Sequence, residues 1–319
     1  MYDILGIGEL LIDFTPIKEK GVKGFVENPG GAPCNMLTMA QNLGAKTAFI
    51  GKVGNDQFGK RLGQVLTEQG INTEGLLYSD KYPTTLAFVH LQDNGDRSFS
   101  FYRKGCADVM IEKDDINFEL INKSKVVHFG SLSFTDEPSK STIETVISLA
   151  KERGKLITYD PNYRPLLWSS EEAAISGMKI GLKYADVIKV SEEEAALLTG
   201  TENIVDAAQL LMEQGVQLVC VTLGEAGSYF AHQNYAGYVK GFKSRVVDTT
   251  GAGDSFFGAV VQGILQRQCN LKDLTVDDLT SILRKANCAA SLCIEGYGGI
   301  PAIPTLDKVN ERLKNTPNI

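Results

Sequence analysis

The residues best suited to chemistry lie in one short stretch, 246–258, which reads VVDTTGAGDSFFG. An apolar run with helical spacing follows the small residues Gly251, Ala252 and Gly253, so the stretch predicts a turn that leads into a helix N-terminus. Backbone N–H groups at a helix start have no intrahelical partner and lie at the positive end of the helix dipole. The stretch therefore predicts an anion site.

Asp254 directly follows these three residues, and its carboxylate would repel a bound phosphate. A carboxylate in this place is better explained as a general base, because an aspartate can accept the proton of the attacking hydroxyl in phosphoryl transfer. The alternative is that Asp254 only caps the helix. Taken alone, these residues favour the two interpretations about equally.

Two segments near the N-terminus also place polar or small residues where a ligand would lie. Asp13 follows a short apolar run and lies between two large apolar residues, so its carboxylate points either to solvent or inward to sugar hydroxyls. Gly30 and Gly31 precede an apolar helical pattern that starts at Met36. They indicate either a close backbone approach to a ligand or a plain turn before a helix.

Charged residues follow strand-like segments further along the chain. The run DPNYRPLLW begins at Asp160, and its Arg164 either clamps phosphate oxygens or pairs with Asp160. Arg103 closes a β-rich segment and reaches either a substrate or phosphate oxygen, or is a solvated charge at a sheet edge. In KVSEEEAALLTG, Ser191 either contacts a ligand or only caps a helix. The acidic residues 192–194 also suit the positive N-terminal end of a helix dipole.

An alternation of strands and helices positions these residues. Between residues 126 and 198, apolar strand-like runs alternate with helical patterns, which predicts a parallel sheet with helices on both faces. Ligands bind beyond the carboxyl ends of the strands in such folds. The predicted helices of the chain cover residues 57–69, 137–153, 171–182, 192–198, 282–292 and 307–313.

A small β-sheet is predicted to cover the site. The β-rich runs 85–91 and 97–102 flank Asp93-Asn94-Gly95-Asp96, which is a good hairpin signal. An isolated hairpin needs a partner, and the segment 14–26 can supply it. We therefore expect a lid with strands from about residues 12–28 and 85–103. Its exposed strand edges suggest a homodimer formed through the lid.

Composition limits the class of protein. The 319 residues, of which 43% are hydrophobic and 22% charged, are those of an ordinary globular protein with ample core. The net charge of −7 argues against nucleic-acid partners and anionic membrane surfaces. No basic signal-peptide region and no apolar run of membrane-spanning length are found, and six scattered cysteines suit a reducing compartment. We expect a cytoplasmic protein without a membrane partner.

Two nucleotide-binding motifs are matched only in part. The run GIGELL near the N-terminus lacks the third glycine of a dinucleotide fingerprint, and no helix start follows it. The run GNDQFGKR comes close to a P-loop, but Arg61 stands where the loop needs a hydroxyl for Mg²⁺. A dehydrogenase is therefore the weakest of the functions considered, and the P-loop match is accidental.

The motif DTTGAGD, which ends at Asp254, resembles letter for letter the signature of the ribokinase-like (PfkB-type) carbohydrate kinases. In that family the last Asp is the catalytic base. The GE-LID run with Asp13 and the GG-x-x-x-N run ending at Asn35 are similar to the family's sugar-binding motifs. The resemblance covers essentially the whole chain. In DPN-x-R-x-x-LW and KVSEEE it is strongest to the fructokinases within the family.

The resemblance implies a single α/β kinase domain over residues 1–319, with a ribokinase-like three-layer fold, a central, mostly parallel sheet and the small β-sheet lid. Catalysis would rest on Asp254 with Gly251, Ala252 and Gly253 as the anion site. The expected sugar-side residues are Asp13, Gly30, Gly31, Asn35, Arg103, Asn162 and Arg164. The expected nucleotide-side residues are Ser191, Thr222, Gly224, Gly227 and Asn287. Glu194 would act on the phosphates through Mg²⁺ and water, and Asp248 and Thr250 correspond to a K⁺ site of some relatives.

The implied activity is ATP-dependent phosphorylation of the primary hydroxyl of fructose, at the 6-position by analogy with bacterial and plant fructokinases. The same scaffold also serves kinases of 2-keto-3-deoxygluconate and of nucleosides, which differ in lid and pocket residues. A sugar-binding module without catalysis is the other alternative. It would be expected to lack a base at the anion turn, and this chain has Asp254 there.

Overall fold

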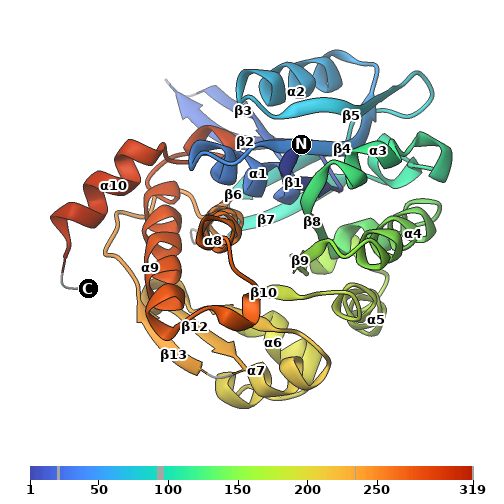
Figure 1. Cartoon of the computed structure of the whole chain (residues 1–319). Coiled ribbons are helices and arrows are strands. Elements are labelled where there is room, and N and C mark those ends of the chain that lie inside the picture. The colour runs from blue at the N-terminus through green and yellow to red at the C-terminus, as the bar shows by residue number, and fades with distance from the viewer. Residues whose placement is uncertain (20–21, 92–96, 234, 318–319) are drawn as a thin grey trace.

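The computed structural model describes residues 1–19, 22–91, 97–233 and 235–317. Across this part of the chain, a large sheet lies between two layers of helices (Figure 1). The predicted three-layer α/β fold is confirmed. Its strands run in the order β13-β12-β11-β10-β9-β8-β1-β4-β5. Their bounds are β1 (Tyr2–Ile7), β4 (Thr47–Gly54), β5 (Asn72–Ser79), β8 (Ser124–Gly130), β9 (Leu156–Asp160), β10 (Val187–Ser191), β11 (Leu218–Thr222), β12 (Gly227–His232) and β13 (Tyr235–Lys240).

The sheet is parallel from β11 to β5, whereas β12 pairs antiparallel with both β11 and β13. Successive strand residues face opposite helix layers, because side chains alternate across a strand. Ile4 packs into one hydrophobic core and Leu5 into the other, and Val187 and Ile188 divide in the same way. This explains why the inner strands read as continuous apolar runs.

The two helix layers cover the two cores. One layer holds α1 (Ala32–Asn42), α2 (Gln57–Glu68), α8 (Ala252–Arg267), α9 (Val276–Cys293) and α10 (Leu306–Asn315). The other holds α3 (Phe118–Asn122), α4 (Ser139–Glu152), α5 (Glu171–Leu182), α6 (Glu192–Thr199) and α7 (Ile204–Glu213). None of the helices in the described ranges is both long and apolar enough to span a membrane.

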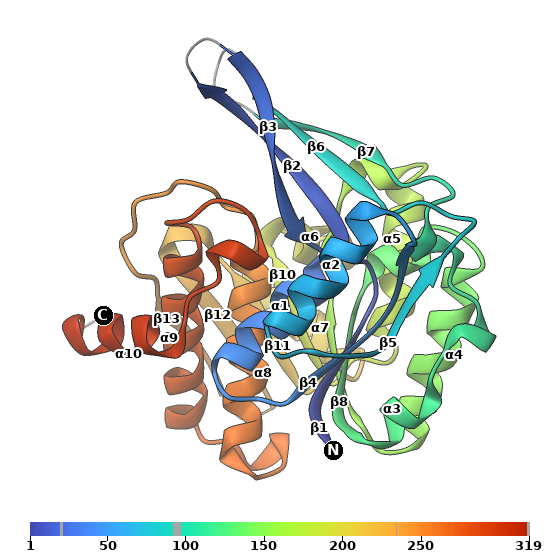
Figure 2. The same cartoon turned by 90° about the horizontal axis from the view of Figure 1, so that it is seen from above.

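The predicted second, smaller sheet is present and projects from the body of the molecule (Figure 2). Its strands are β2 (Leu11–Glu19), β3 (Val22–Gly30), β6 (Leu86–Leu91) and β7 (Arg97–Tyr102), in the order β3-β2-β6-β7. We call this sheet the lid. β2 pairs antiparallel with β3 and parallel with β6, which joins the two hairpins across the middle of the lid. The predicted turn at Asp93-Asn94-Gly95-Asp96 lies outside the described residues.

Element boundaries differ from the sequence-based expectations at a few places. Helix α1 begins at Ala32 rather than near Met36, because Pro33 is well placed in a first helical turn. Helix α9 begins at Val276 rather than at residue 282. Thr275 caps it by accepting a hydrogen bond from the Asp278 amide (3.1 Å). Strand β5 and helix α7 were not predicted.

Candidate active site

A cleft of about 600 Å³ lies between the lid and the carboxyl ends of the central strands. The lid, the start of α1, the loops after β9 and β10, and the turn before α8 all contribute to its lining. Of the residues predicted from the sequence, the cleft brings together Asp13, Gly31, Asn35, Arg103, Asn162, Arg164, Ser191, Glu194, Thr250, Gly251, Ala252, Gly253 and Asp254.

The turn before α8 forms one wall of the cleft. Gly251 is the N-cap of α8 and adopts φ 78°, ψ 0°, a left-handed conformation that glycine reaches without penalty. No side chain caps this helix end. The Ala252 amide makes one long bond, to the Thr249 carbonyl oxygen (3.3 Å), and the anion site expected at the first amides of α8 stays a prediction. Asp254 lies within the first turn of α8 and is not its N-cap.

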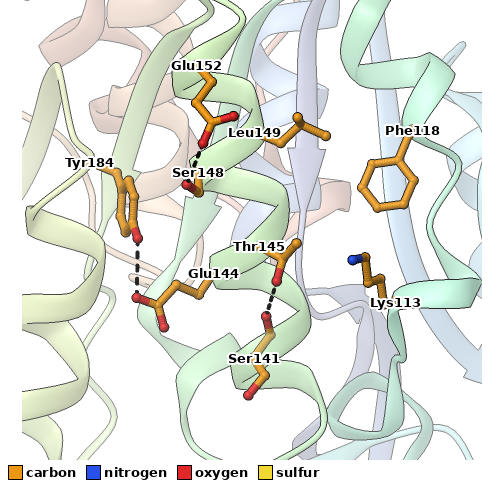
Figure 3. A pocket seen from close by; sticks show the side chains of 9 residues that line it. All are labelled: Lys113, Phe118, Ser141, Glu144, Thr145, Ser148, Leu149, Glu152 and Tyr184. Atoms are coloured by element: carbon orange, nitrogen blue, oxygen red, sulfur yellow. Dashed lines mark hydrogen bonds between the residues drawn. The ribbon is translucent and has the colours of Figure 1, made fainter.

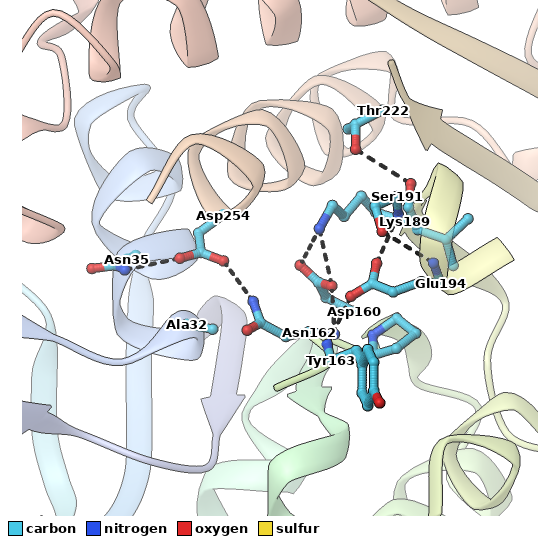
Figure 4. Close-up of polar contacts among 12 residues, drawn as sticks. Ala32, Asn35, Asp160, Asn162, Tyr163, Lys189, Ser191, Glu194, Thr222 and Asp254 are labelled. Atoms are coloured by element: carbon cyan, nitrogen blue, oxygen red, sulfur yellow. Dashed lines mark hydrogen bonds and ion pairs between the residues drawn. The ribbon is translucent and has the colours of Figure 1, made fainter. Parts of the chain in front are cut away.

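Two amide side chains hold the Asp254 carboxylate (Figure 4). Asn35 Nδ2 donates to Oδ2 over 2.8 Å, and Asn162 Nδ2 donates to Oδ1 over 3.2 Å. Asp254 is only 6% exposed. Burial raises the pKa of its carboxyl above the ordinary value, whereas the Asn35 hydrogen bond and the charges of Lys189 and Arg164 act to lower it. Bonds from both amides favour the ionised form.

The loop after β9 places Asn162 by an unusual backbone conformation. Asn162 adopts φ 49°, in the left-handed region that asparagine tolerates better than most residues. Its amide N–H donates to Asp160 Oδ1 (3.0 Å), which closes the turn. The position of Asn162 after β9 and its left-handed turn together point its side-chain amide at Asp254.

A buried ion pair lies beside this turn. Lys189 Nζ is 3.1 Å from both Oδ1 and Oδ2 of Asp160, and both side chains are buried (Figure 4). Glu194, also buried, accepts the backbone N–H groups of Tyr163 and Ser191, each over 2.7 Å. Burial acts to raise the pKa of Glu194, but Lys189 and these two amides hold that pKa below its usual value.

Ser191 performs the capping role that the sequence left as an alternative. Its hydroxyl accepts the Glu194 amide (3.1 Å), and the Glu194 side chain returns the bond to the Ser191 amide. This capping box fixes the start of α6 at the edge of the cleft. Glu194 is therefore fixed by its own helix terminus.

The lid side of the cleft carries an acidic side chain, Asp13. Burial raises the pKa of Asp13 to about 7, with Arg164 opposing and Asp248 and Asp254 adding to the rise. Asp13 therefore points inward, and the solvent-facing alternative is wrong. Gly30 packs against this carboxylate, because a Cβ at Gly30 would lie 2.4 Å from Asp13 Oδ2. Gly31 has φ 115°, and a Cβ there would lie 2.5 Å from the Glu9 carbonyl oxygen.

The two arginines predicted at the site differ in their surroundings. Arg103 is 5% exposed, so a solvated edge charge is excluded. It donates to Asp108 Oδ2 (2.7 Å), to Thr135 Oγ1 (2.7 Å) and to the Leu132 carbonyl (2.8 Å). Arg164 is exposed at the cleft mouth and donates to the Tyr163 carbonyl (2.9 Å). Asp160 pairs with Lys189 instead of Arg164.

Several predicted residues lie away from the lining of this cleft. Thr222 ends β11 and donates to the Val190 carbonyl (3.4 Å), while Gly224 and Gly227 shape the turn into β12. Asn287, on α9, donates to the Val239 carbonyl (2.9 Å) and to the Lys240 carbonyl (3.2 Å) at β13. Their assignment to the nucleotide therefore stays a prediction.

Asp248 also lies outside the cleft lining. It accepts the Thr250 amide and hydroxyl at Oδ1 (3.0 and 2.8 Å) and the Gly298 amide at Oδ2 (3.0 Å). These bonds join the turn before α8 to the loop after α9. The predicted K⁺ site at Asp248 and Thr250 stays a prediction.

Three charged residues of the cleft lining were not predicted as site residues: Glu9, Lys189 and Glu193. Glu9 Oε1 accepts the Ala32 amide (2.9 Å) at the start of α1, and burial raises the pKa of Glu9 to about 7. Lys189 is the one charged residue of strand β10, VIKVS, between the apolar residues Ile188 and Val190. A lysine inside a buried parallel strand is rare without a partner, and that signal was present in the sequence.

A second hollow of about 650 Å³ lies on the outer face of α4 (Figure 3). Glu144 and Tyr184 meet there, with Tyr184 Oη 3.3 Å from Glu144 Oε1. Neither the turn before α8 nor any residue around Asp254 contributes to its lining. Among the described residues, no group of three or more His, Cys, Asp or Glu side chains is arranged to hold a metal. The cleft beneath the lid is therefore the candidate active site.

Comparison with known proteins places the chain among sugar kinases. The family described as "pfkB family carbohydrate kinase" matches residues 1–306. Probable fructokinase-4 from Arabidopsis thaliana is 40% identical over 316 residues, covering 98% of this chain and 96% of the relative. Fructokinase-2 from Oryza sativa subsp. japonica is 38% identical over 322 residues, covering 99% of this chain and 95% of the relative.

Solved structures show the same similarity. A fructokinase from Xylella fastidiosa with bound ATP superposes with a TM-score of 0.91 at 30% identity, covering 99% of both chains. A fructokinase from Vibrio cholerae O395 in a fructose, ADP and calcium ion bound form gives a TM-score of 0.88 at 29% identity, covering 98% of this chain and 99% of the other.

Proposed function

The chain belongs to the pfkB family of carbohydrate kinases, and we propose that it transfers the γ-phosphoryl group of ATP to the primary hydroxyl of fructose, forming fructose 6-phosphate. The observation that carries this proposal is the position of Asp254. Its carboxylate is buried beside the first amides of α8 and is held by Asn35 and Asn162 from opposite sides of the cleft. A base and an anion site thus lie within one helical turn.

The geometry supports a proton transfer coupled to phosphoryl transfer. The sugar lies between the lid and α1, where Asp13 and Asn35 bind its hydroxyls. Asp254 accepts the proton of the attacking hydroxyl, whose oxygen forms the new bond to the γ-phosphorus as the bond to the ADP oxygen breaks. The amides of Gly251, Ala252 and Gly253 stabilise the charge of the transferring group. The lid excludes water, whose attack would hydrolyse ATP.

The acidic floor of the cleft fits Mg²⁺ bound together with the nucleotide. Glu194 has both carboxylate oxygens bonded to backbone amides, so it suits a contact through water better than direct ligation. Mg²⁺ keeps several waters and binds through few carboxylates plus substrate phosphates. When bound, it neutralises phosphate charge. Arg164, exposed at the mouth of the cleft, supplies a further cation for phosphate oxygens.

A test of this function is ADP release with Mg·ATP across a panel of free sugars. The panel holds fructose, glucose, ribose, tagatose, 2-keto-3-deoxygluconate and adenosine. We expect turnover with fructose and little with the others. Preferred turnover of another member would overturn the choice of sugar and leave the kinase assignment intact. No turnover with any member would overturn the catalytic assignment.

We also propose that the protein binds a monovalent cation, K⁺. We assign K⁺ to the loop that Asp248 fixes, because this carboxylate joins the turn before α8 to Gly298. Replacing K⁺ by tetramethylammonium should lower kcat in the wild type, and Asp248→Asn should abolish the difference. Equal kcat values in the two salts would contradict the K⁺ assignment.

We also propose a homodimer through the lid. Asp13 lines the cleft, so Phe14, its neighbour on β2, lies on the opposite face of the lid. There Phe14 stacks on Phe88 (4.7 Å between ring centroids), Phe25 and Tyr102 flank Phe88, and Phe25 is 45% and Tyr102 64% exposed. An exposed aromatic face suits a second copy. Light scattering should show a dimer for the wild type and a monomer for Phe25→Asp; a monomeric wild type would refute this.

A further inference from the structure

We propose that Lys189 is a positioning residue for phosphoryl transfer: its ammonium, fixed by Asp160, lies behind Gly253 and supplies a buried positive charge to the anion-binding turn of α8. This inference deepens the proposed function and rests on it. It concerns a residue that neither the motifs nor the comparisons assign to the site. Three observations carry it: the burial of Lys189, its contact with Gly253, and the charges around it.

Lys189 is held in a single position. It lies on β10 with 6% exposure, and its Nζ contacts both carboxylate oxygens of Asp160 at 3.1 Å. β9 and β10 pair in parallel, which brings these two strand ends side by side. A flexible lysine stem becomes fixed only when its ammonium is bonded in this way. Burying the ammonium is costly unless it is paired.

The contact with the turn explains why position 253 is glycine. A Cβ on Gly253 would lie 2.8 Å from Lys189 Nζ and 3.2 Å from its Cε. Gly253 lies inside α8 and has no left-handed backbone, unlike Gly251 with φ 78°. The two glycines of the GAG sequence are therefore needed for different reasons. Gly251 is required by the backbone of the turn, and Gly253 by the space that the Lys189 ammonium occupies.

The surrounding charges make a cation at this place valuable. Asp160, Glu194 and Asp254 all act on Lys189 electrostatically, and together they outweigh burial and raise its pKa. Lys189 therefore stays charged. Without it, three buried carboxylates would face an incoming polyphosphate, opposed by the exposed Arg164, the helix dipole and Arg103, whose charge is already paired with Asp108. Lys189 places a fixed cation where charge accumulates during transfer, so its effect is expected on kcat.

The experiment compares Lys189→Met with a matched control, Lys52→Met. Lys52 is also a mostly buried strand lysine paired to an aspartate, Asp115 (2.6 Å), but it does not line the cleft. Lys189→Met should lower kcat about tenfold or more. The dissociation constant of the sugar, measured without nucleotide, should stay unchanged. Lys52→Met should keep the kcat of the wild type.

A second comparison tests the contact with Gly253. Gly253→Ala displaces the Lys189 ammonium from Asp160, so in the wild type it should lower both kcat and the melting temperature. In the Lys189→Met background the same substitution should cost less in both quantities, because the clashing atom is gone. If Lys189→Met does not fold, Lys189→Gln replaces it, since glutamine can still donate to Asp160.

A wild-type kcat in a folded Lys189→Met or Lys189→Gln protein would overturn the positioning role. An equal loss of melting temperature for Gly253→Ala in both backgrounds would overturn the contact. These failures differ from failure of the proposed function, in which the wild type itself turns over no sugar. The melting temperatures of the four proteins would still test the contact in that case.

Discussion

Asn35 and Asp254 are 219 residues apart in sequence, and Asn35 Nδ2 donates to Asp254 Oδ2 over 2.8 Å. The bond joins the start of α1 to the first turn of α8. The two helices approach closely at Gly258, where a Cβ would lie 2.4 Å from the Met36 carbonyl oxygen. The residue proposed to bind sugar thus also orients the proposed base. This contact links a proposed sugar-binding residue to the proposed base, which Asn162 also holds.

Asp254→Asn should lower kcat about 100-fold or more, because the amide cannot accept the proton of the attacking hydroxyl. Nucleotide affinity should survive, since the amides of the turn are unchanged. Steady-state kinetics and nucleotide titration measure the two effects. Asp206→Asn, an acidic residue in the first turn of α7, is the control and should behave as the wild type. A near-normal kcat for Asp254→Asn would remove the base assignment.

Substitutions of Asn162 should separate its side chain from its backbone. Asn162→Gly keeps the left-handed conformation and loses the bond to Asp254, so kcat should fall about tenfold with little change in stability. Asn162→Ala should lose the same activity and in addition about 1 kcal/mol of stability, because alanine is strained at φ 49°. Denaturant unfolding of both variants checks this. Equal stabilities would contradict the conformational argument.

Asp13→Ala should weaken sugar binding and leave nucleotide binding intact, because Asp13 lines the cleft on the lid side. We expect the fructose KM to rise about tenfold or more, which corresponds to the loss of a charged hydrogen bond. The nucleotide KM, measured at saturating sugar, is the internal control. Unchanged KM and kcat values for fructose would take Asp13 out of the site.

The raised pKa of Asp13 predicts a pH-dependent stability. Burial raises the folded-state pKa to about 7, whereas an unfolded aspartate titrates near 4, as is usual for this residue (about 3.9). Between these values the folded state binds more protons. The stability contributed by this group is therefore full below about pH 4 and lost as the pH rises through 7.

Asp13→Asn removes this titration. It should increase the free energy of unfolding relative to the wild type by about 1–2 kcal/mol at pH 8, with a smaller gain at pH 5. Urea denaturation at the two pH values measures the difference. If the gain in the free energy of unfolding were the same at both pH values, ionisation of Asp13 would not destabilise the folded protein.

Arg103→Met should destabilise the fold rather than act on chemistry alone. Arg103 and Asp108 form a buried pair with Nε to Oδ2 at 2.7 Å, and removing the cation leaves the carboxylate unpaired. The expected loss is about 3–5 kcal/mol. Arg153→Met, on an exposed arginine, serves as the control. A loss below about 1 kcal/mol would mean that Arg103 remains free to serve the substrate.

The sequence by itself determined the features that depend on residues close together in the chain. The turn at Gly251 and the helix that follows are encoded locally, so the anion site and Asp254 could be predicted from one motif. The alternation of strands and helices is also a local signal, and it predicted the parallel sheet. The lid followed from two β-rich runs that needed a partner. Local backbone preferences and apolar periodicity act over a few residues, which is why they can be read from the chain.

Only the tertiary structure decided which side chains meet. Lys189 and Asp160 pair because β9 and β10 lie side by side. Arg103 points inward because it donates hydrogen bonds to Asp108 and to the Leu132 carbonyl. The sequence left Arg103 open as a surface charge and did not select Lys189 at all. Contacts between segments far apart depend on strand order, register and helix packing, and no local pattern encodes these. The physical reason is that burial and charge pairing are properties of the assembled cleft.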